Sequence, residues 1–244
     1  MRDATFGRNL SSGRGAVTKF YLGVVKLLHS FRFYSLRNER YASMIRDFAG
    51  LSFRRGGFVV DLGCGPGGIT ALLGGVHHLI GVDSDRYYLL RFVEPSVQRI
   101  QARAEHLPLK TGSLSTIVAI SLVEHVADHV AFFRELARVL GPDGHVVLQL
   151  PELRFPIEPH TKWPFLYVLN PSRQARILAA TGYGDLNMDT SLERVIWSAK
   201  EAGLQVDRVA PLWHFRLARL VGVPMGYFAL FKKVTSPLET PKDP

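Results

Sequence analysis

Residues 58–70 read FVVDLGCGPGGIT and join an apolar run, an acid, a cluster of glycines and a second apolar stretch. This order predicts a buried parallel strand, a tight turn and the start of a helix. Glycines let the backbone approach a ligand where a Cβ atom would collide, and a helix start favours negative groups. The stretch therefore predicts a ligand-binding turn at the carboxyl end of a strand.

Two acidic residues lie near this turn and sharpen the prediction. Asp61 stands two residues before the first glycine, where its carboxylate could pair with a cationic group. Asp83 follows a second strand-like run, HLIGV, where α/β folds place an acid that binds ribose hydroxyls. Together they suit a ligand that has both an amino group and a ribose. For the glycines alone, a dinucleotide fingerprint and an ordinary strand–helix turn stay open.

Strand-like and helix-like segments alternate along the chain, which predicts an α/β fold with a parallel sheet and helices on both faces. Asp128 is the expected N-cap of one helix, and Gly141-Pro142 is its expected end. We expect strands near 58–61, 79–83, 98–102, 115–120, 145–150, 205–210 and 227–233, and helices near 68–74, 85–91, 128–140 and 190–202.

The regions outside this alternation define the expected domain organisation. Residues 1–50 are predicted to form a tail and a helical extension, and 51–234 the α/β domain, with a Pro-rich tail over 235–244. The extension holds a basic, apolar-striped helix over 16–33 and a second helix over 37–49 that ends at Gly50. Residues 151–189 are rich in proline and aromatic residues, which predicts a substrate-binding or lid insertion after the fifth strand.

The composition bounds the class of protein. Its 47% hydrophobic and 21% charged residues are globular values, and Cys64 alone can form neither an internal disulfide nor a thiolate zinc cluster. The first residues lack the apolar region of a signal peptide, so a cytoplasmic protein is expected, with the helix over 16–33 as a candidate contact to a membrane surface. The net charge of +9 favours acidic partners.

Four ordered segments carry a family resemblance: VVDLGCGPGGIT, GVDSD, RAEHLPLKTGSLSTIVAISLVEHV and FFRELARVLGPDGHVVLQLP. Together they resemble a class I S-adenosylmethionine-dependent methyltransferase of the type 11 group, over roughly residues 56–151. The resemblance implies a Rossmann-like, doubly wound, mostly parallel seven-stranded sheet, with S-adenosylmethionine as the cofactor and methyl transfer as the reaction. A nicotinamide enzyme and a relative that binds the cofactor without turnover remain as alternatives.

The resemblance also assigns cofactor contacts. It implies that the glycine-rich backbone cradles the methionine end, that Asp61 lies near its ammonium group, and that Asp83 holds the ribose hydroxyls. Many relatives have an acid where this chain has Arg103, and an arginine cannot accept a hydrogen bond from the adenine amino group. The implied cofactor-binding residues are Asp61, Gly63, Cys64, Gly65, Gly67, Asp83, Ser84, Ala104, Glu105 and Ser121.

Candidates for contact with the methyl acceptor are expected at the same edge of the sheet. Methyl transfer depends mainly on alignment, and a general base matters only where the acceptor is protonated. Glu124 and His125 resemble the Glu-His pair of ubiquinone-type O-methyltransferases, but Ser121 replaces an acid that helps those enzymes bind a metal, so no metal site is predicted. Glu158 and His160 lie in the insertion. His160, His125 and Glu124 are the candidate catalytic residues, with structural roles as the alternative.

These features favour O-methylation of a small-molecule, glycan or lipid-linked acceptor. The support is the aromatic insertion and the apolar N-terminal helix. An RNA methyltransferase is the alternative within enzymes, although neither an RNA-binding module nor the catalytic tetrad of base N-methyltransferases is recognisable. That alternative draws on the net charge and on the scattered residues Arg54, Arg55, Arg173, Arg176, Arg216 and Arg219.

Overall fold

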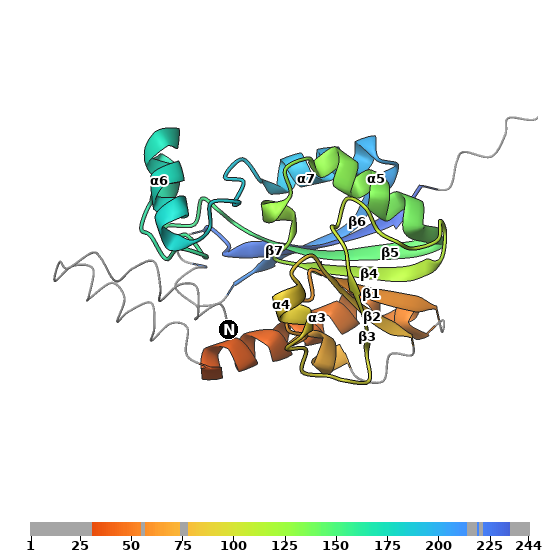
Figure 1. Ribbon diagram of the computed structural model, residues 1–244. Helices are drawn as coiled ribbons and strands as arrows, with labels where there is room; N and C mark the ends of the chain where they lie inside the picture. The colour runs from red at the N-terminus through yellow and green to blue at the C-terminus, as the bar shows by residue number, and fades with distance from the viewer. Residues whose placement is uncertain (1–30, 55–56, 74–77, 214–218, 220–221, 235–244) are drawn as a thin grey trace, which may run out of the picture.

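The computed structural model describes residues 31–54, 57–73, 78–213, 219 and 222–234 (Figure 1). Seven strands form one sheet in the order β3-β2-β1-β4-β5-β7-β6. The strands are β1 (Phe58–Leu62), β2 (Leu79–Asp83), β3 (Gln98–Gln101), β4 (Leu114–Ile120), β5 (Leu140–Pro151), β6 (Leu204–Leu212) and β7 (Gly226–Lys233).

The sheet is mostly parallel, as predicted. Strands β1 to β5 pair in parallel, whereas β7 is antiparallel to both β5 and β6. The order runs outward from β1 in two directions, to β2 on one side and to β4 on the other. The carboxyl ends of β1, β2 and β4 therefore meet at the point where α/β sheets bind ligands.

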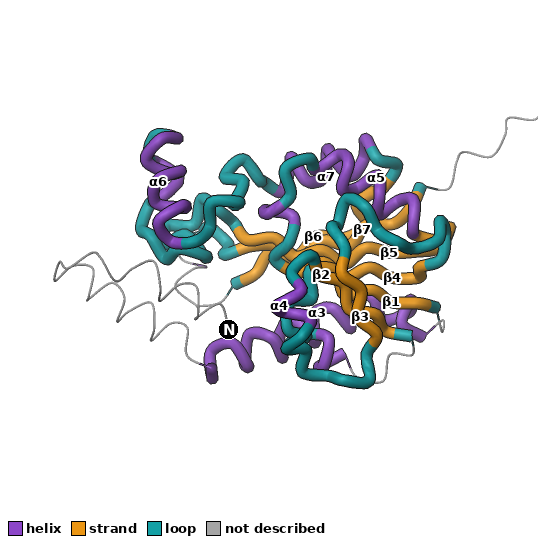
Figure 2. Tube along the Cα trace, in the orientation of Figure 1, coloured by secondary structure: helices purple, strands orange, loops and turns teal. Residues whose placement is uncertain are grey.

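Helices cover both faces of the sheet, as Figures 1 and 2 show. On one face, α5 and α7 pack through Phe132, Leu136 and Val195. On the other, α3 packs through Tyr41 and Ile45. The helices are α3 (Phe31–Arg54), α4 (Arg86–Leu89), α5 (His129–Val139), α6 (Pro171–Thr181) and α7 (Leu192–Glu201), with short 3-10 helices η1 (Thr70–Leu73), η2 (Val123–His125) and η3 (Leu166–Val168).

The predicted boundaries of α5 are close to those observed. The Asp128 carboxylate accepts a 2.9 Å hydrogen bond from the Ala131 amide, which confirms this residue as the N-cap. The helix ends at Val139, just before the predicted Gly141-Pro142 stop. Strand β5 begins at once at Leu140, earlier than expected, and its pairing with β4 jumps from Leu140 to His145.

Three other boundaries differ from the prediction. Helix α3 continues through Gly50 to Arg54, so the stop expected at Gly50 is wrong; a Cβ there would meet nothing within 4 Å. The helix expected over 68–74 is only the 3-10 turn η1, because glycines on both sides leave too few helix-forming residues. The helix expected over 85–91 shortens to α4. Of the helix predicted over 16–33, residues 16–30 lie outside the described residues.

The insertion after β5 has a small hydrophobic core of its own. It contains η3 and helix α6, which was not predicted. Leu153, Leu166, Leu178 and Tyr183 are buried together there, separately from the two clusters that flank the sheet. Figure 1 shows α6 beyond the end of the sheet, away from α5 and α7. In the part of the chain that is described, no helix is long and apolar enough to cross a membrane.

Candidate functional site

The glycine-rich turn is held against the end of β2. The amides of Gly63 and Cys64 donate to the Val82 carbonyl at 2.8 and 3.1 Å. Gly63 and Gly65 have φ values of +73° and +54°, which L side chains rarely adopt. A Cβ at Gly65 would meet nothing within 4 Å, so the backbone at this position faces open space. The turn is therefore shaped to accept a ligand beside Gly65.

Asp83 connects this turn to the end of β2. Its Oδ2 accepts a 2.8 Å hydrogen bond from the Gly65 amide, and its Oδ1 accepts one of 2.8 Å from the Asp85 amide. Each carboxylate oxygen can accept a further hydrogen bond, and Asp83 is only half-buried. Neighbouring Ser84 is exposed, and its carbonyl accepts from the Gln101 side chain at 3.1 Å. The carboxylate thus keeps capacity to accept further hydrogen bonds beside the turn.

Asp61 lies beneath the turn and is buried. Burial raises the pKa of its carboxyl to about 6, while a hydrogen bond from the Thr70 hydroxyl lowers it and the charge of Asp83 raises it. None of these three influences is cationic. A cationic group bound nearby would therefore stabilise the ionised carboxylate.

Gly67 and Cys64 serve the packing of the turn. A Cβ at Gly67 would lie 2.7 Å from the ring of Phe92, so this glycine makes room for that ring. Cys64 is buried in the same small cluster with Leu89 and Phe92, and burial raises the pKa of its thiol. At these two positions only the backbone is left to contact a ligand.

The segment that the sequence assigns to adenine contact follows β3. Ala104 is buried in the core beneath α5. The Arg103 side chain is 72% exposed and forms a 3.3 Å ion pair with Glu105. Arg103 therefore points outward, which leaves Glu105 and the backbone as the groups that could contact a base.

Ser121 directly follows β4 and has an unusual backbone conformation. Its φ is +49°, and its hydroxyl donates a 2.7 Å hydrogen bond to the side-chain carbonyl of Gln149. The Ser121 amide also donates to the Gln149 backbone carbonyl at 3.1 Å. Gln149 is buried on β5 and was not predicted as a site residue. A polar residue within the apolar run VVLQL is the signal that marks it.

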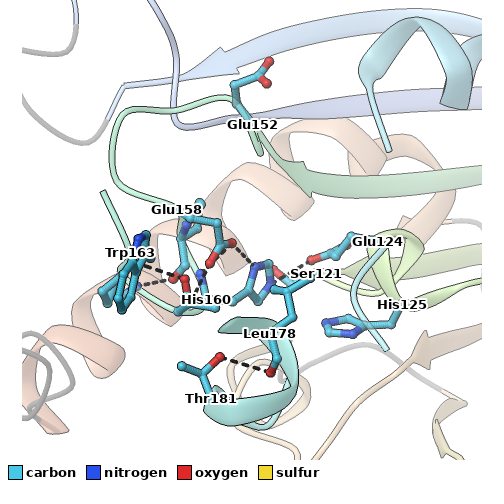
Figure 3. Close-up of polar contacts among 12 residues, drawn as sticks. Ser121, Glu124, His125, Glu152, Glu158, His160, Trp163, Leu178 and Thr181 are labelled. Atoms are coloured by element: carbon cyan, nitrogen blue, oxygen red, sulfur yellow. Dashed lines mark hydrogen bonds and ion pairs between the residues drawn. The ribbon is translucent and has the colours of Figure 1, made fainter. Parts of the chain in front are cut away.

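Four polar residues meet where the insertion contacts η2; we call Glu124, His125, Glu158 and His160 the insertion cluster. Figure 3 shows the His160 ring between the Glu158 and Glu124 side chains, with His125 beside them. His160 Nδ1 lies 2.8 Å from Glu158 Oε1, and His160 Nε2 lies 3.3 Å from Glu124 Oε1. The structure thus brings together two motifs that lie more than 30 positions apart in the sequence, Glu124-His125 and Glu158 with His160.

The charges in the cluster stabilise one another. Burial alone would lower the pKa of His160, but hydrogen bonds and charge from Glu124 and Glu158 raise it to about 9. Burial would raise the pKa of Glu158, but contacts with His160 and with the amides of His160 (2.9 Å) and Thr161 (2.5 Å) lower it to about 2. His160 and Glu158 therefore form an ion pair that is buried and held by the fold.

Residues at the end of the insertion complete the surroundings of the cluster. His125 Nδ1 lies 2.9 Å from Asp185 Oδ2. The His160 ring packs edge-on against those of His125 and Tyr183, with centroids 5.4 Å apart in both pairs. The Asn187 amide donates to the Glu124 carbonyl at 2.8 Å. Sequence reasoning missed Tyr183 and Asp185, because only the path of the chain after α6 brings TGYGD to this site.

Sequence comparison places a methyltransferase domain over the same region. A model of the family described as "Methyltransferase domain" matches residues 60–148. A Mycobacterium tuberculosis protein named "Probable S-adenosylmethionine-dependent methyltransferase" is 32% identical over 141 residues, which cover 53% of this chain and 50% of that protein. A trans-aconitate 2-methyltransferase of Azoarcus sp. is 36% identical over 98 residues, 38% of each chain. The chain spans half or less of the length of these curated relatives.

Solved structures share the fold. A geranyl diphosphate methyltransferase in complex with S-adenosylmethionine aligns over 93% of this chain and 94% of its own, with a TM-score of 0.61 and 16% identity. An S-adenosylmethionine-dependent methyltransferase from Mesorhizobium loti aligns over 73% of this chain and 91% of its own, with a TM-score of 0.59 and 19% identity. At these identities the likeness concerns the fold.

Proposed function

We propose that this chain, which carries a class I S-adenosylmethionine-dependent methyltransferase domain, methylates an oxygen atom of a small-molecule, glycan or lipid-linked acceptor. One observation carries the choice of site: the insertion places His160 and Glu158 against Glu124, only three residues after Ser121 at the end of β4. The acceptor would bind between the cofactor turn and the insertion cluster.

The residues at the turn fit the cofactor. Space beside Gly65, the half-buried carboxylate of Asp83 and the buried carboxyl of Asp61 match a methionine end, a ribose and an ammonium group. Ser84, Glu105 and the backbone near Ala104 would contact the sugar and the base, and Ser121 would lie near the reacting end. When bound, S-adenosylmethionine supplies a methyl group on a sulfonium centre.

The insertion offers the features of an acceptor site. Trp163, Phe165 and Tyr167 keep 36%, 53% and 37% of their surface exposed, which is a large aromatic area for one segment. Exposed aromatic rings that carry polar neighbours bind sugar rings and isoprenoid chains well. The names of the relatives mention trans-aconitate and geranyl diphosphate, so the relatives themselves point to acceptors of different chemistry.

We assign acceptor contacts to His160 and His125, with the buried Glu124 acting through its contact with His160. Their side chains lie together on η2 and on the insertion, beside the end of the strand that carries Ser121. Holding the acceptor oxygen in line with the sulfonium carbon would supply much of the rate, since such a displacement depends on alignment. Because these groups are held by the fold, they would position the acceptor without rearrangement.

The test uses S-adenosylmethionine with a labelled methyl group and extract of the source cells. We expect label in the lipid, polysaccharide or small-molecule fraction. Label in RNA would contradict the proposal and turn attention to the exposed Arg173 and Arg176 on α6. His160→Ala should lose transfer yet still bind S-adenosylhomocysteine, whereas Asp83→Ala should lose binding itself. Unchanged turnover in His160→Ala would refute the assignment of that residue.

A further inference from the structure

The two histidines of the insertion cluster are held in the same way. His160 Nδ1 lies 2.8 Å from Glu158, and His125 Nδ1 lies 2.9 Å from Asp185. A neutral imidazole that donates its Nδ1 hydrogen to a carboxylate keeps a lone pair on Nε2, and a metal ion that binds His160 would displace the Nε2 proton held by the metal-free site. Histidines that ligate metals almost always have their second nitrogen oriented by a carboxylate or carbonyl in this manner. Each ring is therefore oriented as a metal ligand would be.

Glu124 supplies the second observation. Its side chain is wholly buried, and neither carboxylate oxygen makes a well-directed hydrogen bond within the described part of the chain. Its recorded contact is the 3.3 Å approach of His160 Nε2 to Oε1. A buried carboxylate is costly unless both oxygens are satisfied, and the His160 contact engages only Oε1, so Oε2 is left for a further cationic partner.

The distances suit a common ion. Glu124, His125 and His160 each offer a ligand atom, and these atoms lie within 4.8 Å of one another. Two ligands that each lie about 2.1 Å from one ion are roughly 3.0–3.4 Å apart in tetrahedral or octahedral geometry. The 3.3 Å between His160 Nε2 and Glu124 Oε1 falls in that range.

We propose that Glu124, His125 and His160 bind a divalent transition-metal ion, with Glu158 and Asp185 orienting the two imidazoles. Two nitrogen ligands and one carboxylate suit zinc or cobalt better than magnesium, which prefers oxygen. Three protein ligands leave a position for water or for an acceptor oxygen. Metal binding does not depend on the proposed methyl transfer, so the two can fail separately.

The sequence around Glu124 lacks only the metal site known from ubiquinone-type relatives. Ser121 replaces the acid found in ubiquinone-type relatives, and its hydroxyl is bonded to Gln149. The third ligand comes instead from His160, in an insertion whose path the sequence does not predict. The metal set proposed here is therefore different from the one whose absence the sequence indicated.

Cobalt is the probe for the test. Full-length protein without a polyhistidine tag is stripped with a chelator, dialysed and titrated with Co²⁺, while visible d–d absorption and calorimetry report binding. We expect one equivalent of Co²⁺ to bind, to be displaced by Zn²⁺, and to raise the melting temperature. A folded wild-type protein that shows no Co²⁺ spectrum and no heat of binding would overturn the proposal.

Matched variants locate the site. Glu124→Gln and His160→Gln should abolish Co²⁺ binding, and Asp185→Asn should weaken it by about 10- to 100-fold while the exposed position preserves folding. His106→Gln makes the same chemical change at an exposed histidine outside the cluster and should bind as wild type does. Retained binding in Glu124→Gln and His160→Gln, with folding checked by circular dichroism, would show that the cluster is only an ion-paired structural contact.

Discussion

The amide of Gly65 donates a 2.8 Å hydrogen bond to Oδ2 of Asp83, so the glycine-rich turn and the end of β2 are joined before any ligand binds. The same carboxylate holds the Asp85 amide through its other oxygen. Asp83 therefore shapes the turn, and in the proposed cofactor site its carboxylate would also accept hydrogen bonds from the ribose. Because both roles depend on one carboxylate, we expect a substitution of Asp83 to weaken cofactor binding.

Asp83→Asn should weaken the binding of S-adenosylhomocysteine by roughly 10- to 100-fold, because hydrogen bonds to a charged group contribute about 1.5–3 kcal/mol. Isothermal titration calorimetry gives the affinity. Asp207→Asn is the control, since Asp207 pairs with Lys232 on the exposed edge formed by β6 and β7. Equal affinities for the two variants would remove Asp83 from the cofactor site.

Cofactor affinity should fall as the pH drops below about 6, because the pKa of Asp61 is raised to about 6 and its protonated form cannot pair with an ammonium group. One unit below that pKa the loss is roughly tenfold. The contribution of Asp61 to folding stability changes with pH in the opposite direction. A raised carboxyl pKa favours the folded state at low pH, and this contribution is lost as the pH rises from about 4 to about 6. Binding measured from pH 5 to 7.5 should be flat in Asp61→Asn. A flat profile in the wild type would contradict the pairing.

Substitutions at two glycines should separate stability from binding. Gly67→Ala should destabilise the protein by about 1–3 kcal/mol, since φ is +80° and the new Cβ would lie 2.7 Å from Phe92. Gly65→Ala has a similar φ penalty but meets no protein atom within 4 Å, so its larger effect should be on cofactor affinity. Thermal unfolding with and without S-adenosylhomocysteine checks both variants. A Gly65→Ala protein that binds normally would show that no ligand approaches this position.

Much of the sheet could be predicted because its central strands β1, β2 and β4 are mostly apolar runs bounded by turn residues. The alternation of strand-like and helix-like segments predicted a parallel sheet, and residue type predicted the Asp128 cap, whereas the strand order was not predicted. Helix α6 also carried local signals that went unused: Asn170 caps it, Pro171 starts it and Gly182 ends it in the left-handed conformation. The aromatic and proline content of the preceding loop obscured that pattern.

The insertion cluster is a different case. Glu124 and His160 were both candidates, but their contact depends on how the insertion folds back over η2. Two contacts hold the insertion in this position. The Asn187 amide donates to the Glu124 carbonyl, and Asp185 contacts His125. No local propensity encodes either contact. The raised pKa of His160 and the proximity of Glu124, His125 and His160 both arise from these tertiary contacts, so neither could be predicted from the sequence.

The separate core of the insertion leads to a prediction about local stability. Leu178→Ala removes a buried side chain from the cluster of Leu153, Leu166 and Tyr183, where such a change costs about 2–5 kcal/mol. Since this cluster is apart from the two that flank the sheet, hydrogen exchange should speed up within 151–189 while β1 and β4 stay protected. Leu136→Ala, on the buried face of α5, is the matched control and should lower protection throughout the domain. If Leu178→Ala also exposes the sheet, the insertion and the sheet unfold as one cooperative unit, and His160 is held by the global fold and not by the insertion's own packing.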